Sequence, residues 1–115
     1  MTPSPISIAV LGASGYTGAE CIRLLLGHPH ARIAALAGDS QAGKPLGAIY
    51  PHLAFAGLPD LVRAEHIDYR DIQAVFCCLP HGTTQEVVRA LPAHVRIIDL
   101  SADFRLKDTA LYETW

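Results

Sequence analysis

Three glycines in one short segment are the residues of this sequence with the clearest chemical meaning. Gly12, Gly15 and Gly18 stand at every third position of the segment Gly-Ala-Ser-Gly-Tyr-Thr-Gly, residues 12–18. The diphosphate of a dinucleotide needs a sharp turn, a close backbone approach and a helix packed tightly on the preceding strand. Three glycines supply these features in order. The spacing G-x-x-G-x-x-G differs from the commoner G-x-G-x-x-G, so the flanking elements must decide its meaning.

Polar side chains lie between these glycines. Ser14, Tyr16 and Thr17 carry hydroxyl groups that add candidate contacts to a bound nucleotide. A helix that begins here presents free N–H groups and a partial positive charge to an anion. The alternative is a glycine turn that serves packing alone.

Apolar periodicity places the glycines in a βαβ unit. The run Ile-Ser-Ile-Ala-Val-Leu, residues 6–11, predicts a short buried strand that ends at Gly12. From Thr17 onward the apolar residues recur at helical spacing until Gly27-His28-Pro29 stops the helix. Residues 32–37 predict a second strand. The glycine segment therefore opens the first helix of a βαβ unit, which is the context that a dinucleotide-binding turn requires.

The rest of the chain continues this alternation. Residues 38–59 are rich in Gly and Pro and predict a long surface loop with a short helical turn. A helix is predicted from Thr83, which caps it with Glu86 in the capping-box position, to Leu91. Further strands are predicted at residues 61–64, 74–79 and 95–100. The pattern predicts an α/β fold, a Rossmann-like doubly wound parallel sheet that binds ligands at the carboxyl ends of its strands.

Residues after the second strand bear on the choice of nucleotide. An acid at this place selects NAD through the ribose hydroxyl, and Asp39 stands there. Ser40 and Lys44 follow and suit the 2′-phosphate of NADP. The residues alone leave the two cofactors open.

Two later loops begin where strands end at the same edge of the sheet. Pro80, His81 and Gly82 follow the fourth predicted strand, and Ser101 follows the last. We expect these residues to lie beside the nicotinamide ribose, with His81 as a cofactor or substrate contact or, alternatively, a solvated turn residue.

Composition narrows the class of partner. The chain of 115 residues is 50% hydrophobic and 17% charged, with a formal net charge of −2, which predicts one packed domain over residues 1–115. It has no Lys/Arg cluster, so we expect no nucleic-acid or membrane partner. Cys21, Cys77 and Cys78 lack metal-ligand spacing and are interpreted as reduced, buried thiols of a cytoplasmic protein. His28 and His30 have no third ligand nearby, so no metal site is predicted.

Several stretches together resemble the N-acetyl-gamma-glutamyl-phosphate reductases, which are of the semialdehyde-dehydrogenase type. They follow one order along nearly the whole chain, and the stretch at residues 98–105, Ile-Asp-Leu-Ser-Ala-Asp-Phe-Arg, is the most specific. The others are the glycine segment with Ala19 and Glu20, His28-Pro29, residues 39–44, Pro51-His52-Leu53 and Leu79-Pro80-His81-Gly82.

The resemblance implies NADPH-dependent reduction of an acyl phosphate to an aldehyde with release of phosphate, a step of arginine biosynthesis. The family uses a cysteine thiolate to attack the acyl phosphate, and hydride then reduces the thioester. An NADP preference favours Ser40 and Lys44 as the 2′-phosphate side. Arg105 is a candidate neighbour of the substrate phosphate, or else the ion-pair partner of Asp103.

The family's nucleophile lies in a Pro-Gly-Cys-Tyr-Pro-like segment that this sequence does not contain. We therefore expect no catalytic residue here. The chain is interpreted as the cofactor domain of a longer reductase, truncated before the substrate domain and inactive alone. We also expect an exposed apolar surface and a homo-oligomer. The alternatives are a short-chain dehydrogenase or epimerase domain, which shares the glycine spacing, and a non-catalytic dinucleotide-sensing module.

Overall fold

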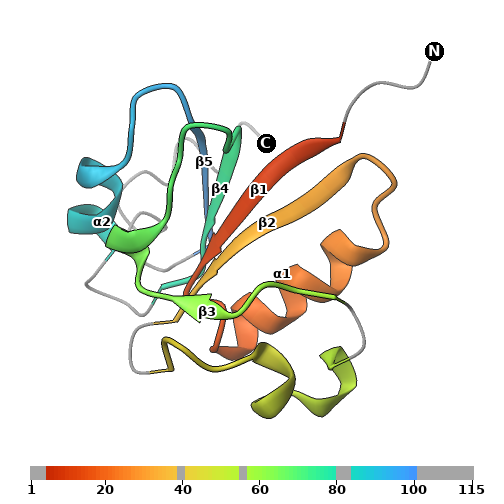
Figure 1. Ribbon diagram of the computed structural model, residues 1–115. Coiled ribbons are helices and arrows are strands. Elements are labelled where there is room, and N and C mark those ends of the chain that lie inside the picture. Colours follow the sequence, from red (N-terminus) through yellow and green to blue (C-terminus); the bar gives the residue numbers. More distant parts are fainter. Residues whose placement is uncertain (1–4, 39–40, 55–56, 80–83, 101–115) are drawn as a thin grey trace, which may run out of the picture.

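A parallel sheet organises the chain. The computed structural model describes residues 5–38, 41–54, 57–79 and 84–100, and in this part five strands lie in the order β3-β2-β1-β4-β5 (Figure 1). Every pairing between them is parallel. The strands are β1 Ile6–Leu11, β2 Ala31–Ala37, β3 Leu61–Val62, β4 Ala74–Cys77 and β5 Arg96–Asp99. The predicted doubly wound α/β fold is confirmed.

Two helices cover opposite faces of this sheet. Helix α1, Tyr16–Leu26, packs Cys21 and Ile22 into a core on one face, and helix α2, Thr84–Ala90, packs against a second core on the other (Figure 1). Right-handed crossovers produce this arrangement, because β1 to β2 and β4 to β5 run in opposite directions from the middle of the sheet. Cys77 and Cys78 belong to different cores, as their adjacent places in a strand predict.

The predicted loop after β2 contains two short 3-10 helices. These are η1, Leu46–Ala48, and η2, Pro51–Leu53. Their residues Leu46 and Leu53 are buried in the core on the α1 face. The loop is therefore attached to the domain by its own apolar side chains, and the single helical turn that the sequence predicts is in fact a pair of turns.

Several elements end earlier than the sequence predicts. Strand β3 stops at Val62, and the 3-10 helix η3, Ala64–His66, replaces its expected last residue. The reason is that β3 pairs only with β2, which itself ends at Ala37. Strands β4 and β5 end at Cys77 and Asp99 for the same reason, since β1 ends at Leu11. Helix α2 is one residue shorter at its carboxyl end, and its predicted cap, Thr83, lies outside the described residues.

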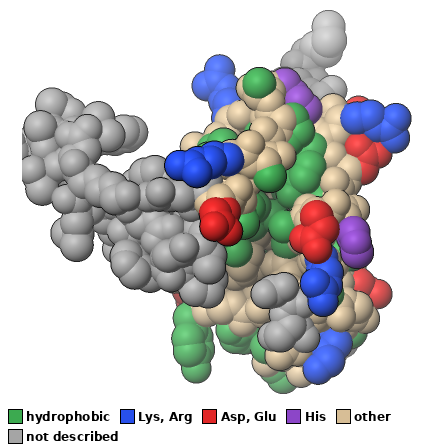
Figure 2. Space-filling model, turned by 90° about the vertical axis from the view of Figure 1, so that its left-hand side faces the viewer, with side chains coloured by type: hydrophobic (Ala, Val, Ile, Leu, Met, Phe, Trp, Pro, Cys, Tyr) green, Lys and Arg blue, Asp and Glu red, His purple; other side chains and the backbone are tan. Residues whose placement is uncertain are grey.

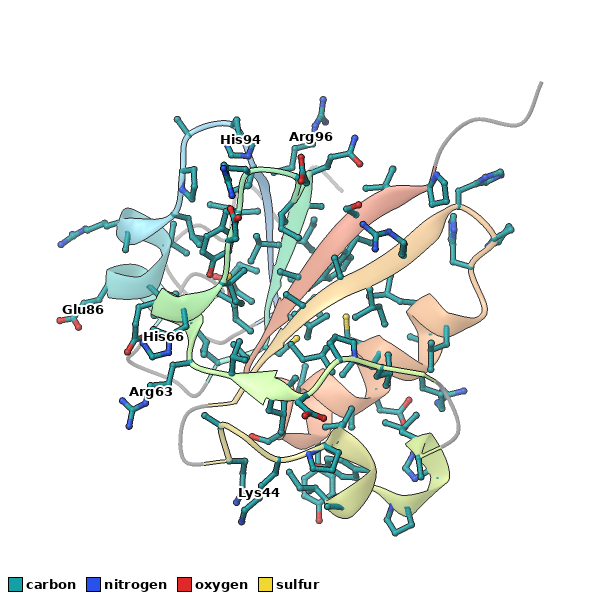
Figure 3. All side chains as sticks on the ribbon, viewed as in Figure 1. Lys44, Arg63, His66, Glu86, His94 and Arg96 are labelled. Carbon is teal, nitrogen blue, oxygen red and sulfur yellow. The ribbon has the colours of Figure 1, made fainter. Side chains whose placement is uncertain are left out.

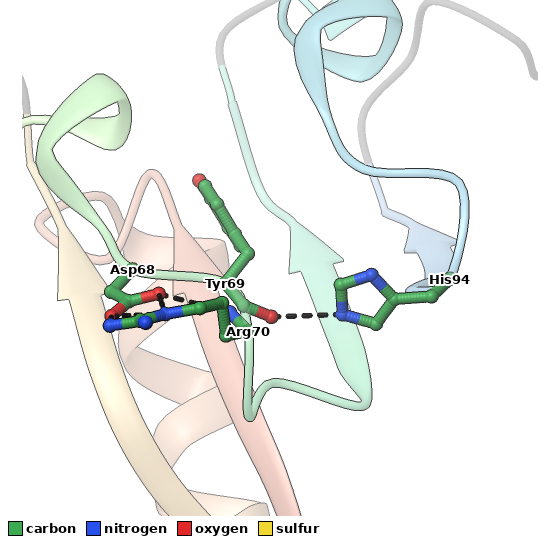
Figure 4. Close-up of polar contacts among 4 residues, drawn as sticks. All are labelled: Asp68, Tyr69, Arg70 and His94. Atoms are coloured by element: carbon green, nitrogen blue, oxygen red, sulfur yellow. Dashed lines mark hydrogen bonds and ion pairs between the residues drawn. The ribbon is translucent and has the colours of Figure 1, made fainter.

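The most prominent surface ion pair lies at the amino ends of the strands (Figure 4). Arg70 contacts the Asp68 carboxylate at 2.6 Å just before β4, and these hydrogen bonds lower the pKa of Asp68 to about 2. The ring nitrogen Nε2 of His94, just before β5, donates to the Tyr69 carbonyl oxygen at 2.9 Å. The bond from His94 to Tyr69 joins the loop before β4 to the loop before β5. Both loops lie at the amino ends of the strands, whereas this fold binds ligands at the carboxyl ends.

Candidate functional site

The glycine segment forms a tight turn between β1 and α1. Gly12 has a φ of +73°, and a Cβ atom there would lie 2.4 Å from the carbonyl oxygen of Cys78. The turn is held to the end of β2 by a hydrogen bond from the Ala13 N–H to the Ala37 carbonyl oxygen, 2.8 Å long. Only glycine fits at Gly12, because both the positive φ and the approach to β4 exclude a side chain. Gly12 therefore allows the sharp turn after β1.

The other two glycines have different surroundings. A Cβ atom at Gly18 would lie 2.4 Å from the Gly12 carbonyl oxygen and 2.8 Å from the Ala13 Cα atom, so Gly18 permits the close contact of helix and turn. At Gly15 the nearest atom would be 3.7 Å away, an ordinary contact, and φ is −86°. Nothing in the described part of the protein requires a glycine at Gly15.

The amino end of α1 is open to an anion. Its N-cap residue, Gly15, provides no side-chain cap, and the first turn holds no acidic residue. The first N–H groups of a helix lack intrahelical partners and carry a partial positive charge. Gly15, Tyr16 and Thr17 are all exposed here. The site therefore has donors and positive potential that the described side chains do not neutralise.

Four strands end together beside this turn. Leu11 is in register with Ala37 of β2 and with Cys77 of β4, and Cys77 is in register with Asp99 of β5. The direction of the crossovers changes between β1 and β4, next to Gly12, and such a switch point is the ligand crevice of this fold. The predicted contacts that follow β4 and β5 lie outside the described residues: Pro80, His81, Gly82 and Ser101.

Two predicted contacts lie toward β2 and β3. The Ser14 hydroxyl oxygen is near Gly38, because a Cβ built on Gly38 would be 3.3 Å from it. Lys44 is exposed, and its carbonyl oxygen accepts a hydrogen bond of 2.9 Å from the Leu61 N–H at the start of β3. Figure 3 shows Lys44 near the carboxyl ends of the strands, with His94 and Arg96 at the opposite end. Ser40 and Asp39 lie outside the described residues.

Tyr50 also contacts the site, and no sequence motif marks it. Its hydroxyl donates a hydrogen bond of 2.8 Å to the Ser14 carbonyl oxygen in the glycine segment. Its ring also meets the ring of Tyr16 edge-on, at 6.4 Å between centroids. The contact joins segments 36 residues apart, so no local pattern in the sequence predicts it.

The three cysteines are buried and free, as predicted. Burial raises the pKa of the Cys77 thiol to about 11, and the charge of Asp99 adds to this effect. The Cys78 thiol contacts that of Cys21. This contact, aided by burial, raises the pKa of Cys78, and the same contact lowers the pKa of Cys21 against the opposing effect of burial. Nucleophilic attack needs an accessible thiolate. These buried positions do not offer one.

The described surface has mixed charges. Figure 2 shows acidic, basic and histidine side chains interspersed on one face rather than gathered by sign. Glu20 and Arg23 form an exposed ion pair at 2.8 Å, as expected for a solvated helix face. Among the described residues there is no group of three or more His, Cys, Asp or Glu side chains suited to a metal ion. The same part of the chain contains no helix long and apolar enough to cross a membrane.

Comparison with known families identifies this type of domain. Residues 7–114 match the family model described as semialdehyde dehydrogenase, NAD binding domain. The chain belongs to this family. The glycine turn, the switch point and the open amino end of α1 are thus parts of a nucleotide-binding domain of the semialdehyde dehydrogenases. The match favours this family over the short-chain dehydrogenase group, which the glycine spacing also suggested.

The similar curated proteins carry the name of the family that the sequence resembles. The chain is 57% identical over 108 residues to the N-acetyl-gamma-glutamyl-phosphate reductase of Jannaschia sp. (strain CCS1), covering 94% of this chain and 32% of that protein. It is 54% identical over 110 residues to a probable chloroplastic N-acetyl-gamma-glutamyl-phosphate reductase of Oryza sativa subsp. japonica, covering 96% and 26%. The chain therefore spans about a third or less of the length of these relatives.

Solved structures show the same fold. An aspartate semialdehyde dehydrogenase with NADP from Candida albicans matches with a TM-score of 0.75 at 22% identity, over 90% of this chain and 32% of that one. An aspartate semialdehyde dehydrogenase II complexed with ASA from Vibrio cholerae matches with a TM-score of 0.72 at 18% identity, over 90% and 30%. At this level of identity the comparison establishes the fold alone.

Proposed function

We propose that this chain is the NADP-binding domain of an N-acetyl-gamma-glutamyl-phosphate reductase. The whole protein would reduce N-acetyl-gamma-glutamyl phosphate to the semialdehyde and release phosphate, a step of arginine biosynthesis. The names of relatives above 50% identity support this reaction. We place the protein in the cytoplasm and note that the rice relative is named as chloroplastic.

The observation that best supports nucleotide binding is the difference in surroundings among the three glycines. Gly12 and Gly18 are required by contacts within the protein, whereas a Cβ at Gly15 would meet nothing closer than 3.7 Å. Gly15 is also the N-cap of α1, next to N–H groups without side-chain caps. A diphosphate resting on these groups would occupy the space that a side chain at Gly15 would fill. The ligand supplies the reason for glycine that the protein itself lacks.

The residues of this chain would hold and orient the nucleotide. Bound NADPH would supply the hydride. The turn with Ser14, Tyr16 and Thr17 would hold the diphosphate, and Ser40 with Lys44 would contact the 2′-phosphate. The nicotinamide side would face the segments that include Pro80, His81, Gly82 and Ser101. The nucleophilic thiolate and the acyl-phosphate contacts would come from a further domain, so the 115-residue chain would bind NADP without turnover.

Calorimetric titration with NADP⁺ tests the proposal through two matched glycine variants. Gly15→Val should abolish binding while leaving the melting temperature within a few degrees, because a Cβ there meets only ordinary contacts. Gly27→Val, at the other end of α1, is the control, since its Cβ would also have its nearest neighbour at 3.7 Å. It should bind as the wild type does. Unchanged affinity in Gly15→Val would contradict this placement of the diphosphate, and an absence of binding by the wild type would contradict the proposed function.

A further inference from the structure

Tyr50 links the loop after β2 to the glycine turn. It lies between η1 and η2 and is half-buried. Its hydroxyl donates to the Ser14 carbonyl oxygen at 2.8 Å, and its ring makes edge-on contacts with Tyr16, 6.4 Å between centroids, and with His52, 6.1 Å between centroids. The hydroxyl is thus positioned by two ring contacts as well as by its own hydrogen bond.

The backbone around Tyr50 is firmly held. The Tyr50 N–H donates to the Leu46 carbonyl oxygen, and the Tyr50 carbonyl oxygen accepts from the Leu53 N–H, each at 2.9 Å. Leu46 and Leu53 are almost fully buried. The two 3-10 helices also approach closely, since a Cβ at Gly47 would lie 2.7 Å from the Ala54 Cα atom. Tyr50 therefore stands on a fixed base anchored in the core.

The peptide unit between Ser14 and Gly15 is held at both ends. Tyr50 binds its carbonyl oxygen, and its N–H donates to the Gly12 carbonyl oxygen at 3.2 Å. This unit immediately precedes the first N–H groups of α1, which favour an anion. A carbonyl dipole turned toward a diphosphate would repel it, and the flexible backbone of Gly15 would permit that rotation.

We propose that Tyr50 is a positioning residue of the nucleotide site, which keeps the Ser14 carbonyl oxygen turned away from the diphosphate and so preorganises the turn. This inference rests on the proposed function, because it assumes that the turn receives a dinucleotide. It assigns to the loop after β2 a part in nucleotide affinity that the glycine pattern alone does not indicate.

The test compares Tyr50→Phe with Tyr69→Phe. Both changes delete a hydroxyl that donates to a backbone carbonyl oxygen at 2.8–3.0 Å in a partly buried place, and both keep the ring. Only Tyr50 contacts the glycine turn, whereas Tyr69 binds the Ala64 carbonyl oxygen. Each variant is titrated calorimetrically with NADP⁺ and with adenosine 2′-phosphate, which lacks the diphosphate, and its melting temperature is recorded.

Tyr50→Phe should bind NADP⁺ about three- to tenfold more weakly, as expected for one net hydrogen bond. Its affinity for adenosine 2′-phosphate should stay unchanged, and Tyr69→Phe should bind both ligands as the wild type does. Amide exchange of Gly15, whose N–H donates to the Gly12 carbonyl oxygen, should be faster in Tyr50→Phe alone in the free protein, which gives a readout independent of the ligand.

Unchanged NADP⁺ affinity in Tyr50→Phe, or an equal loss for both ligands, would overturn the inference. Unchanged amide exchange would also overturn it, since the turn would then be fixed by other contacts. A wild-type chain that does not bind NADP⁺ would instead contradict the proposed function, so the two failures are distinguishable.

Discussion

At the scale of single residues, the site combines positions that the protein requires with positions that a ligand would require. Gly12 and Gly18 belong to the first kind, because a side chain at either would collide with backbone atoms 2.4 Å away. Gly15 and the exposed Thr17 belong to the second. The glycine segment could be recognised from sequence because its function depends on local spacing. Tyr50 could not, because its hydrogen bond to Ser14 depends on how a loop without clear periodicity folds back.

Lys44 is the residue on which the choice between NADP and NAD should depend. Lys44→Ala should weaken NADP⁺ binding by roughly 1–2 kcal/mol, the effect of one charge-assisted contact, or about tenfold in affinity. NAD⁺ binding should stay unchanged, since NAD⁺ lacks the 2′-phosphate. Arg96→Ala removes an exposed cation at the amino end of β5 and is the control for the general effect of charge. Calorimetric titration of both variants with both nucleotides checks this. Equal losses for the two cofactors would show that Lys44 does not contact the 2′-phosphate.

At the scale of elements, sequence periodicity predicted which segments form strands and helices better than it predicted their ends. Apolar runs predicted all five described strands. Side chains of β1 and β4 fill the two cores, whereas β5 remains largely exposed. The ends depend on pairing partners instead. Leu79 was expected in β4, but that strand stops at Cys77 because β1 turns away at Gly12. Such an end is a tertiary property, so the run of apolar residues could not reveal it.

The buried thiol of Cys77 in strand β4 should make the domain less stable at alkaline pH. Cys77 has a pKa of about 11 in the folded chain, above its ordinary value near 9. Below pH 9 the thiol is protonated in both the folded and the unfolded chain, and the stabilisation linked to the raised pKa is fully present. Between pH 9 and 11 the unfolded chain loses the proton while the folded chain retains it, so the free energy of unfolding falls as the pH rises. A pKa difference of this size lowers the free energy of unfolding by about 2 kcal/mol by pH 10.5.

Urea unfolding of the reduced protein at pH 8 and pH 10.5 measures this effect. Between pH 8 and pH 10.5 the free energy of unfolding should fall by about 2 kcal/mol more in the wild type than in Cys77→Ala. The comparison uses this change with pH, so a lower stability of the variant at pH 8 does not affect it. Subtraction removes the parts of the raised pKa values of Cys78 and Tyr69 that come from burial and other neighbours. The small part that comes from the charge of Cys77 belongs to the effect measured. Parallel losses in the two proteins would show that the Cys77 thiol titrates alike when folded and unfolded.

At the scale of the whole molecule, the sheet has one incompletely covered region among the described residues. Helix α1 lies over β1 and β2, and the crossover from β4 to β5 places α2 on the opposite face. The α1 face of β4 and β5 therefore carries two adjoining hollows of about 440 and 420 Å³, which share Leu25 and Phe76. Their lining is largely apolar, and it includes Leu24 and Ile98, which are 65% and 36% exposed.

An apolar region of this kind promotes association, and we predict that the 115-residue chain forms dimers through it. A second copy carries the same surface, so a two-fold arrangement would cover both regions at once. Leu24→Lys should shift the chain to monomer, because it puts a charge into the apolar hollow. Helix α1 should persist, because Lys forms helices about as readily as Leu. Leu26→Lys is the matched control, since Leu26 is 43% exposed on the same helix but lines neither hollow. Sedimentation velocity over a range of concentrations should show dimers in the wild type and in Leu26→Lys, and monomers in Leu24→Lys. A wild type that stays monomeric at the highest concentration would contradict the prediction, as would equal dissociation in both variants.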